Sequence, residues 1–129
     1  MGFKSAKLLI ATVGLCLGSA AIAEDLVYFG TDPTDTVFYY DAETIRRYSN
    51  NTVEVWTNWD ASKDKTVSWR TMRAKLRLDC DTESFGYKAV YKYSADGIIT
   101  YSKDFQYPKM ESIPPASSIN ALFKILCPR

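Results

Sequence analysis

One stretch of the chain, residues 72–80, constrains the fold more than any other. Apolar and charged side chains alternate along it without exception, and a period of two is typical of a strand with one buried and one solvated face. The apolar positions are Met72, Ala74, Leu76, Leu78 and Cys80. The charged positions are Arg73, Lys75, Arg77 and Asp79. Such a strand belongs in an antiparallel sheet that is covered on one side only.

Further strands are predicted on both sides of this one, because aromatic and β-branched residues favour strands and gather in short runs between turn-forming residues. The predicted strands cover residues 26–29, 37–40, 52–59, 85–93 and 98–105. Tight turns are expected at 49–51, 81–84 and 95–97, where Asn, Asp, Ser or Gly occur. The strands from residue 52 onward therefore form a meander.

A short helix is predicted near the C-terminus. Pro114 and Pro115 exclude a strand interior, and Ser117 or Ser118 can cap a helix. Apolar residues follow at the helical spacing i, i+3, i+4, i+7, namely Ile119, Leu122, Phe123 and Leu126. Because a helix with one apolar side must lie on an apolar surface, we expect it to cover the buried face of the sheet. That face is predicted to carry Leu76, Leu78, Tyr87 and Tyr91.

The N-terminal segment, residues 1–23, has the features of a secretory signal peptide. Two lysines precede an apolar run over residues 8–17, and small residues then lead to an A-x-A site that ends at Ala23. We therefore expect cleavage after Ala23. The product is a single exported domain over residues 24–129, periplasmic or secreted.

Two other interpretations of this segment are open. A membrane anchor needs roughly 20 apolar residues, and the run here is shorter and broken by Gly14 and Gly18. Lipidation of Cys16 is the second alternative, because an apolar residue lies three positions before it. Leu15 stands where a small residue normally precedes the lipidated cysteine. We therefore prefer cleavage after Ala23 and keep an outer-membrane lipoprotein as the alternative.

Removal of Cys16 with the signal peptide leaves Cys80 and Cys127 as a single pair in a compartment where thiols oxidise. Cys80 ends the apolar face of its strand, and Cys127 lies on the apolar side of the helix. A bond between them would pin the helix to the sheet, and the loop-closure model assigns it about 4 kcal/mol. The sequence thus predicts an α+β fold, an antiparallel sheet with one C-terminal helix held by a disulfide.

Charge and residue usage argue against several function classes. Without the leader, which holds two of the 16 Lys and Arg residues, 14 remain against 15 Asp and Glu, so nothing favours nucleic acid. The chain has no histidine, which removes the commonest general base and metal ligand. Two carboxylate pairs, Asp79 with Asp81 and Asp60 with Asp64, lie in turn sequences, where such residues usually form the turn. We expect no enzyme, no cofactor and no metal.

A set of short motifs also runs through the chain in a fixed order. The motifs are Tyr40-Asp41, Ile45-Arg46-Arg47, Val53-Glu54-Val55-Trp56, Asp79-Cys80, Ile113-Pro114-Pro115-Ala116-Ser117 and Cys127. The set resembles the surface-adhesin protein E family of Gram-negative bacteria over residues 37–127. The resemblance implies an antiparallel sheet of about six strands with a C-terminal helix. It also implies binding rather than catalysis, since the named member is an outer-membrane lipoprotein that adheres to host extracellular-matrix proteins.

The solvated face of the 72–80 strand has a predicted register with the next strand. If the four-residue loop 81–84 sets this register, Leu78 faces Tyr87 on the buried side. On the solvated side, Arg77 then faces Lys88. Like charges directly opposite each other destabilise a sheet.

The same register places Arg73 opposite Lys92, so this surface is locally basic on a neutral protein. Either carboxylates of neighbouring strands, such as Glu54 or Asp104, neutralise it, or it contacts an acidic partner. The candidate partner-binding residues are Arg73, Lys75, Arg77, Lys88 and Lys92.

Two functions agree with these observations. The first is a small exported binding module of the adhesin type, which contacts a protein or an anionic polysaccharide of the host matrix or cell envelope. It can form a homodimer through an exposed strand edge. The second is a periplasmic accessory or inhibitor protein that docks on an endogenous envelope protein.

Overall fold

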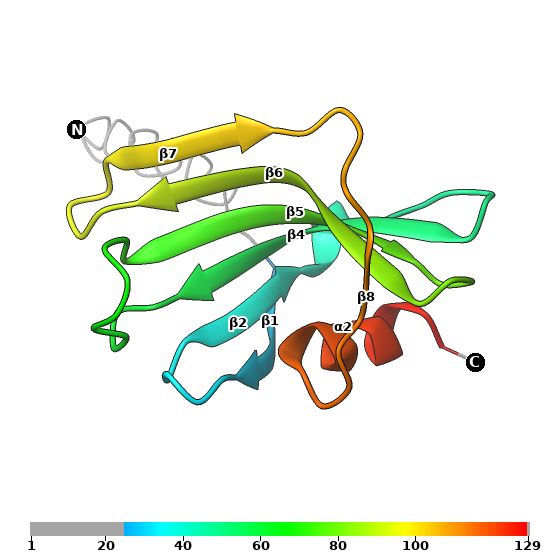
Figure 1. The fold of residues 1–129 in the computed structure, drawn as a ribbon, viewed down its shortest axis with the longest axis horizontal. Helices are drawn as coiled ribbons and strands as arrows, with labels where there is room; N and C mark the ends of the chain where they lie inside the picture. Colours follow the sequence, from blue (N-terminus) through cyan, green and yellow to red (C-terminus); the bar gives the residue numbers. More distant parts are fainter. Residues whose placement is uncertain (1–24, 129) are drawn as a thin grey trace, which may run out of the picture.

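The computed structural model describes residues 25–128, which form eight strands, one 3₁₀ helix and one α-helix (Figure 1). The strands are β1 (Leu26–Thr31), β2 (Val37–Asp41), β3 (Arg46–Arg47), β4 (Thr52–Asp60), β5 (Thr71–Asp79), β6 (Ser84–Tyr93), β7 (Ile99–Asp104) and β8 (Glu111–Ser112). The helices are η1 (Ala42–Thr44) and α2 (Ser118–Leu126). The proposed signal peptide lies outside the described residues.

The strands within this range belong to one antiparallel sheet. Its long strands follow the order β1-β2-β4-β5-β6-β7, a meander in which each long strand pairs with the next. The two-residue strands β3 and β8 pair with β4 and β6. The expected count of about six strands matches the long ones and is wrong for the whole sheet, because two-residue strands are too short to show a hydrophobic period.

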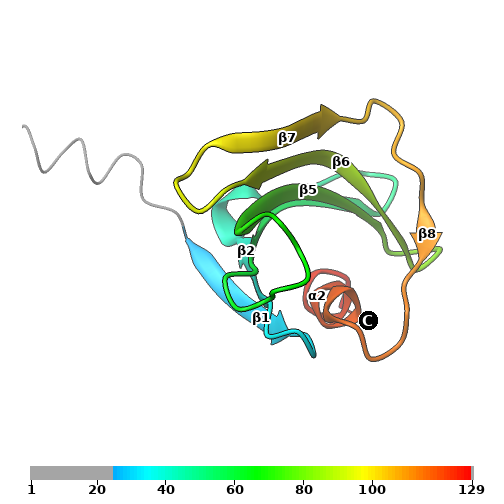
Figure 2. The same ribbon diagram turned by 60° about the vertical axis from the view of Figure 1, so that its left-hand side comes forward.

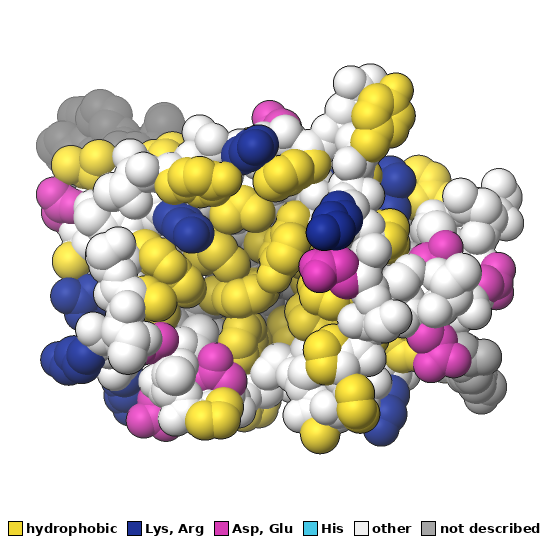
Figure 3. Space-filling model, viewed as in Figure 1, with side chains coloured by type: hydrophobic (Ala, Val, Ile, Leu, Met, Phe, Trp, Pro, Cys, Tyr) yellow, Lys and Arg dark blue, Asp and Glu magenta, His cyan; other side chains and the backbone are white. Residues whose placement is uncertain are grey.

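The sheet curls around α2 (Figure 2). We call the side that carries the helix the inner face and the opposite side the outer face. The helix packs closely beside β1. It does not cover the whole inner face, and apolar side chains are visible in a hollow over the strands beside it (Figure 3).

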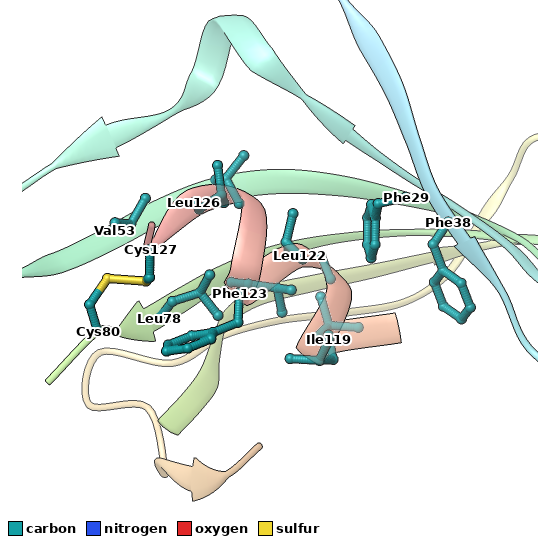
Figure 4. Packing of buried hydrophobic residues seen from close by; sticks show 14 of the residues in the cluster. Phe29, Phe38, Val53, Leu78, Cys80, Ile119, Leu122, Phe123, Leu126 and Cys127 are labelled. Atoms are coloured by element: carbon teal, nitrogen blue, oxygen red, sulfur yellow. A yellow bond between two sulfur atoms is a disulfide. The ribbon is translucent and has the colours of Figure 1, made fainter. Parts of the chain in front are cut away.

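The hydrophobic core lies between α2 and the inner face (Figure 4). The buried residues of the helix are those that the helical spacing predicts, Ile119, Leu122, Phe123 and Leu126. The sheet contributes alternate residues of β4 and β5, namely Val53, Val55, Met72, Ala74, Leu76 and Leu78. The helix therefore buries one side through its period of about 3.6 residues, and the sheet buries one face through the period of two residues in its strands.

Specific contacts hold both ends of α2. At its start, the Ser117 hydroxyl accepts the N–H of Asn120 at 3.1 Å and donates to the carbonyl of Pro114 at 2.7 Å. At its end, Cys127 forms a disulfide with Cys80, with the two Cα atoms 5.5 Å apart and the residues 47 positions apart in sequence. The predicted disulfide is thus confirmed, and it ties the last helical turn to the end of β5.

The register between β5 and β6 differs from the prediction. Asp79 pairs with Ser84, so the turn covers residues 80–83 instead of 81–84. The carboxylate of Asp79 explains the earlier turn, because its Oδ1 accepts the backbone N–H groups two and three positions ahead, at 3.0 and 3.1 Å. The predicted pairs that prove wrong are Leu78 with Tyr87, Arg77 with Lys88 and Arg73 with Lys92.

A β-bulge shifts the register a second time. Lys88 lies between Tyr87 and Ala89 and has no partner residue on β5. An extra residue in one strand moves the side chains that follow it to the opposite faces. Tyr91 therefore lies on the outer face, and Lys92 lies on the inner face. Both were expected on the other side of the sheet.

Candidate functional site

Four basic side chains line the outer face of the sheet. We call them the basic stripe, which consists of Arg73, Lys75 and Arg77 of β5 and Lys88 of β6. The three residues of β5 alternate with fully buried ones, so the strand period places them on one side. Lys92, the fifth predicted residue, is separated from them by the bulge and the thickness of the sheet. The structure thus brings together four of the five predicted residues.

The carboxylate of Glu54 lies beneath the stripe. Glu54 belongs to β4 and is only 3% exposed. The Nε of Arg77 donates to Oε2 of Glu54 at 2.8 Å, and the Nη2 of Arg77 lies 2.6 Å from the same oxygen. Lys75 Nζ is 3.6 Å from Oε1, and the hydroxyl of Tyr48 donates to Oε1 at 3.3 Å. Of the two carboxylates named as able to neutralise this face, Glu54 therefore pairs with two of its cations.

Glu54 is held in its ionised form by this surrounding. Burial alone raises the pKa of a carboxyl group. The hydrogen bond from Arg77 and the positive charges of Arg77, Lys75 and Lys88 outweigh burial, so the pKa of Glu54 lies below its ordinary value of 4.5. At neutral pH the site therefore contains a fixed negative charge that orients two of the cations.

The cations exceed the carboxylate in number. A surface hollow of about 510 Å³ is lined by Tyr48, Ser49, Asn50, Thr52, Glu54, Lys75, Arg77 and Lys88. Three of these side chains are positive and one is negative. Lys88 Nζ donates to the carbonyl of Gln106 at 3.3 Å, and its charge acts on Glu54 without a direct ion pair like those of Lys75 and Arg77. The lining thus carries two positive charges in excess.

A second hollow, of about 390 Å³, continues the site along the outer face. Its lining consists of Trp56, Lys75, Lys88, Ala89, Tyr91, Asp104, Phe105 and Gln106. The rings of Trp56 and Tyr91 stack with centroids 5.8 Å apart and planes at 20°. The guanidinium of Arg73 lies 5.1 Å from the centre of the Trp56 ring. Lys75 and Lys88 line both hollows, which we together call the groove, and it contains cations, the stacked rings and the carboxylate of Asp104.

The groove can bind an elongated anion that also has a flat apolar surface. Lys and Arg side chains pair with carboxylate or sulfate groups, and ring faces offer stacking surface. The alternation of residues does not predict the aromatic half of the groove, because Tyr91 reaches the outer face only through the bulge. The sequence signal that could have revealed it is the excess of aromatic residues, which was interpreted as strand-forming alone.

The carboxylates considered for catalysis serve as turn acceptors. Asp79 accepts two backbone N–H groups at the β5–β6 turn, and Asp81 accepts the side-chain amide of Asn51 at 2.6 Å. Asp60 accepts the N–H of Ser62 at 3.0 Å. Asp64 accepts the N–H and the hydroxyl of Thr66 at 2.9 and 2.5 Å. Asp60, Asp64 and Asp79 thus belong to local turn structure, and Asp81 links two separate turns.

The curved sheet, the disulfide-held helix and the outer groove define a small α+β domain with one charged, aromatic surface. The model of the surface-adhesin protein E family matches residues 27–128, and the chain belongs to this family. No curated protein sequence matches it.

Solved structures of Haemophilus influenzae protein E have the same fold. Crystal form II aligns with a TM-score of 0.61 at 15% identity, over 82% of this chain and 89% of that one. A second structure of this protein aligns with a TM-score of 0.55 at 13% identity, over 82% and 86%. Protein E from a non-typeable strain gives 0.56 at 15% identity, over 82% and 77%. None of the helices in residues 25–128 is long and apolar enough to cross a membrane.

Proposed function

We propose that this protein is a small exported, non-enzymatic binding module of the adhesin type. Its basic stripe contacts an anionic macromolecule of the host matrix or the cell envelope. The family to which the chain belongs is described as a surface adhesin, which supports a binding role. The observation that carries the proposal is the charge arrangement around Glu54, where three cations surround one carboxylate.

The ion pairs prepare this surface for binding. Glu54 fixes the positions of Arg77 and Lys75, so part of the side-chain entropy is already lost before a partner arrives. The remaining positive charge attracts anions over a distance of about 10 Å at 0.1 M salt. Binding through this surface is therefore expected to weaken steeply as the salt concentration rises.

Of the two expected partner classes, the groove favours an anionic polysaccharide over an acidic protein. A sulfated or carboxylated sugar chain carries negative groups at regular intervals and sugar rings between them. Lys75 and Lys88 lie where the cationic hollow meets the aromatic hollow. One chain could therefore pair with the cations and stack on Trp56 and Tyr91 at the same time.

The test is a charge reversal of Arg73, Lys75 and Lys88 to Glu. Binding to heparin, as a model polyanion, would be measured at several salt concentrations together with the melting temperature. We expect at least a tenfold loss of affinity and a smaller dependence on salt. Arg77 is kept, because its removal would leave the buried carboxylate of Glu54 without its closest partner.

A matched control reverses three exposed lysines away from the groove, Lys63, Lys65 and Lys124. Its net charge equals that of the first variant, so a general charge effect would weaken heparin binding in both. Equal affinity of the stripe variant and the control would overturn the proposal.

We propose the periplasm or the outside of the cell as the location of the protein. Mass spectrometry of the mature protein would show either a start at Glu24 or a lipid on Cys16. The second function, docking on an endogenous envelope protein, would show as a stable native partner in an envelope cross-linking experiment. A homodimer through β7, whose six residues are all exposed, would be detected by sedimentation.

A further inference from the structure

The inner face of the sheet has a hollow that the helix leaves open. It has a volume of about 340 Å³ and is lined by Trp59, Trp69, Met72, Tyr87, Val90, Lys92 and Tyr101. Figure 3 shows apolar side chains gathered in this part of the surface, with basic side chains around them. Six of the seven lining residues are aromatic or aliphatic, which is the usual composition of a small-molecule site.

The floor of this inner hollow is apolar. Met72 and Val90 are 5% and 8% exposed and belong to the hydrophobic core. The indole N–H of Trp59 donates to the hydroxyl of Thr57 at 2.8 Å, and this fully buried hydroxyl donates to the carbonyl of Ala74 at 2.8 Å. The only polar atom of the Trp59 side chain is therefore already bonded within the sheet. Its ring contributes carbon surface to the hollow.

A single charge lies over this surface. The Nζ atom of Lys92 is 5.1 Å from the centre of the Tyr101 ring and 5.9 Å from that of Trp69. The ion pairs found among residues 25–128 both involve Glu54, on the other face of the sheet. Within the described part of the chain, Lys92 thus has aromatic faces as its neighbours and no carboxylate at ion-pair distance. A ligand that brings one would supply the missing countercharge.

We propose that the inner hollow binds a single-chain amphiphile with a carboxylate head, of the fatty-acid class. The hydrocarbon chain lies on Trp59, Met72 and Val90, and the carboxylate pairs with Lys92. The charge of Lys92 selects an anionic head and repels a cationic one. The proposal is independent of the proposed function, because the basic stripe lies on the opposite face of the sheet.

The experiment compares three probes with the same ten-carbon chain and different heads. These are decanoate and decyltrimethylammonium below their micelle concentrations and 1-decanol below its solubility limit, all followed by tryptophan fluorescence and calorimetry. We expect decanoate to bind about tenfold or more tightly than decanol, because only its carboxylate can form a charge-assisted hydrogen bond with Lys92. The cationic probe should bind least.

Variants then connect the selectivity to one residue. Lys92→Gln should weaken decanoate binding about tenfold or more and leave decanol binding unchanged, whereas Lys92→Arg should retain binding. Lys124→Gln, which removes an exposed lysine of α2, is the control with the same loss of charge. Melting curves confirm that each variant is folded, and heparin binding should be the same in all of them.

Three outcomes would overturn the proposal. The first is equal affinity for all three heads, which would indicate a nonspecific apolar surface. The second is decanoate binding that Lys92→Gln leaves unchanged. The third is a stable dimer in sedimentation that does not bind decanoate, which would mean that a second copy of the chain covers the hollow.

Discussion

At the scale of single residues, Glu54 connects the stability of the domain with the charge of its outer face. Its side chain is 4% exposed, whereas those of Lys75 and Arg77 are 33% and 35% exposed. The carboxylate is therefore buried, and its cations remain partly in solvent. A buried carboxylate can stay ionised only with such partners.

Replacement of Glu54 by Gln keeps the shape of the side chain and removes its charge. At neutral pH we expect a loss of about 1 to 2 kcal/mol in the free energy of unfolding, since solvent already screens the partly exposed cations. The pKa of Glu54 is lower in the folded state than its ordinary value of 4.5. Its stabilising effect is therefore present above that value and is lost as the pH falls through the folded-state pKa.

The measurement is urea unfolding of both proteins between about pH 7 and pH 3. The difference between the wild type and E54Q should shrink toward the acidic end. Glu43→Gln, at an exposed position of η1, should change the free energy by less than about 0.5 kcal/mol. A difference that stays constant over the whole pH range would contradict the ion pair as its source.

At the scale of elements, the sequence predicts some strands better than others. The alternation in β5 is complete, because every second residue enters the core and the others reach solvent. In β6 the bulge at Lys88 interrupts the alternation between buried and exposed residues. A glycine in a strand often indicates a bulge, but residues 88 and 89 are lysine and alanine. The element type was predicted correctly, and the faces of the residues after the bulge were not.

The same bulge limits how much of the candidate site could be predicted. The positions of Arg73, Lys75 and Arg77 follow from the alternation in one strand. Pairing across strands depends on the turn and the bulge, which are set by local hydrogen bonds such as those of Asp79. The stacked pair of Trp56 and Tyr91 and the inner hollow could therefore not be derived from the sequence pattern.

The N-cap of α2 gives a prediction at this scale. Both Ser117 and Ser118 were candidates for the cap, and the structure assigns it to Ser117. Ser117→Ala should lower the free energy of unfolding by about 1 kcal/mol, because the N–H of Asn120 loses its acceptor. Chemical denaturation measures this loss, and Ser118→Ala is the matched control with an expected change below about 0.5 kcal/mol. A larger effect for Ser118 would contradict the assignment.

At the scale of the whole molecule, the disulfide joins the two parts of the fold. The Cys80–Cys127 bond spans 47 residues and links the end of β5 to the end of α2. The residues between them include β6, β7 and β8. Its reduction therefore releases almost half of the described chain from a covalent constraint.

Reduction should lower the free energy of unfolding by about 4 kcal/mol, the value that the loop-closure model gives for a loop of this size. The measurement is urea unfolding with and without dithiothreitol. The double variant Cys80→Ala/Cys127→Ala should have the stability of the reduced protein and should not respond to the reductant. A loss below about 1 kcal/mol would show that packing alone holds the helix.

The division of β5 between the core and the surface has a consequence for the divergence of such domains. Its even-numbered residues maintain the interior, and its odd-numbered residues from 73 to 77 face solvent. Substitutions at the latter positions can change the charge of the outer face while the interior stays intact. Proteins that share this fold at 13% to 15% identity can therefore differ in the charge of this face through a handful of replacements on one strand.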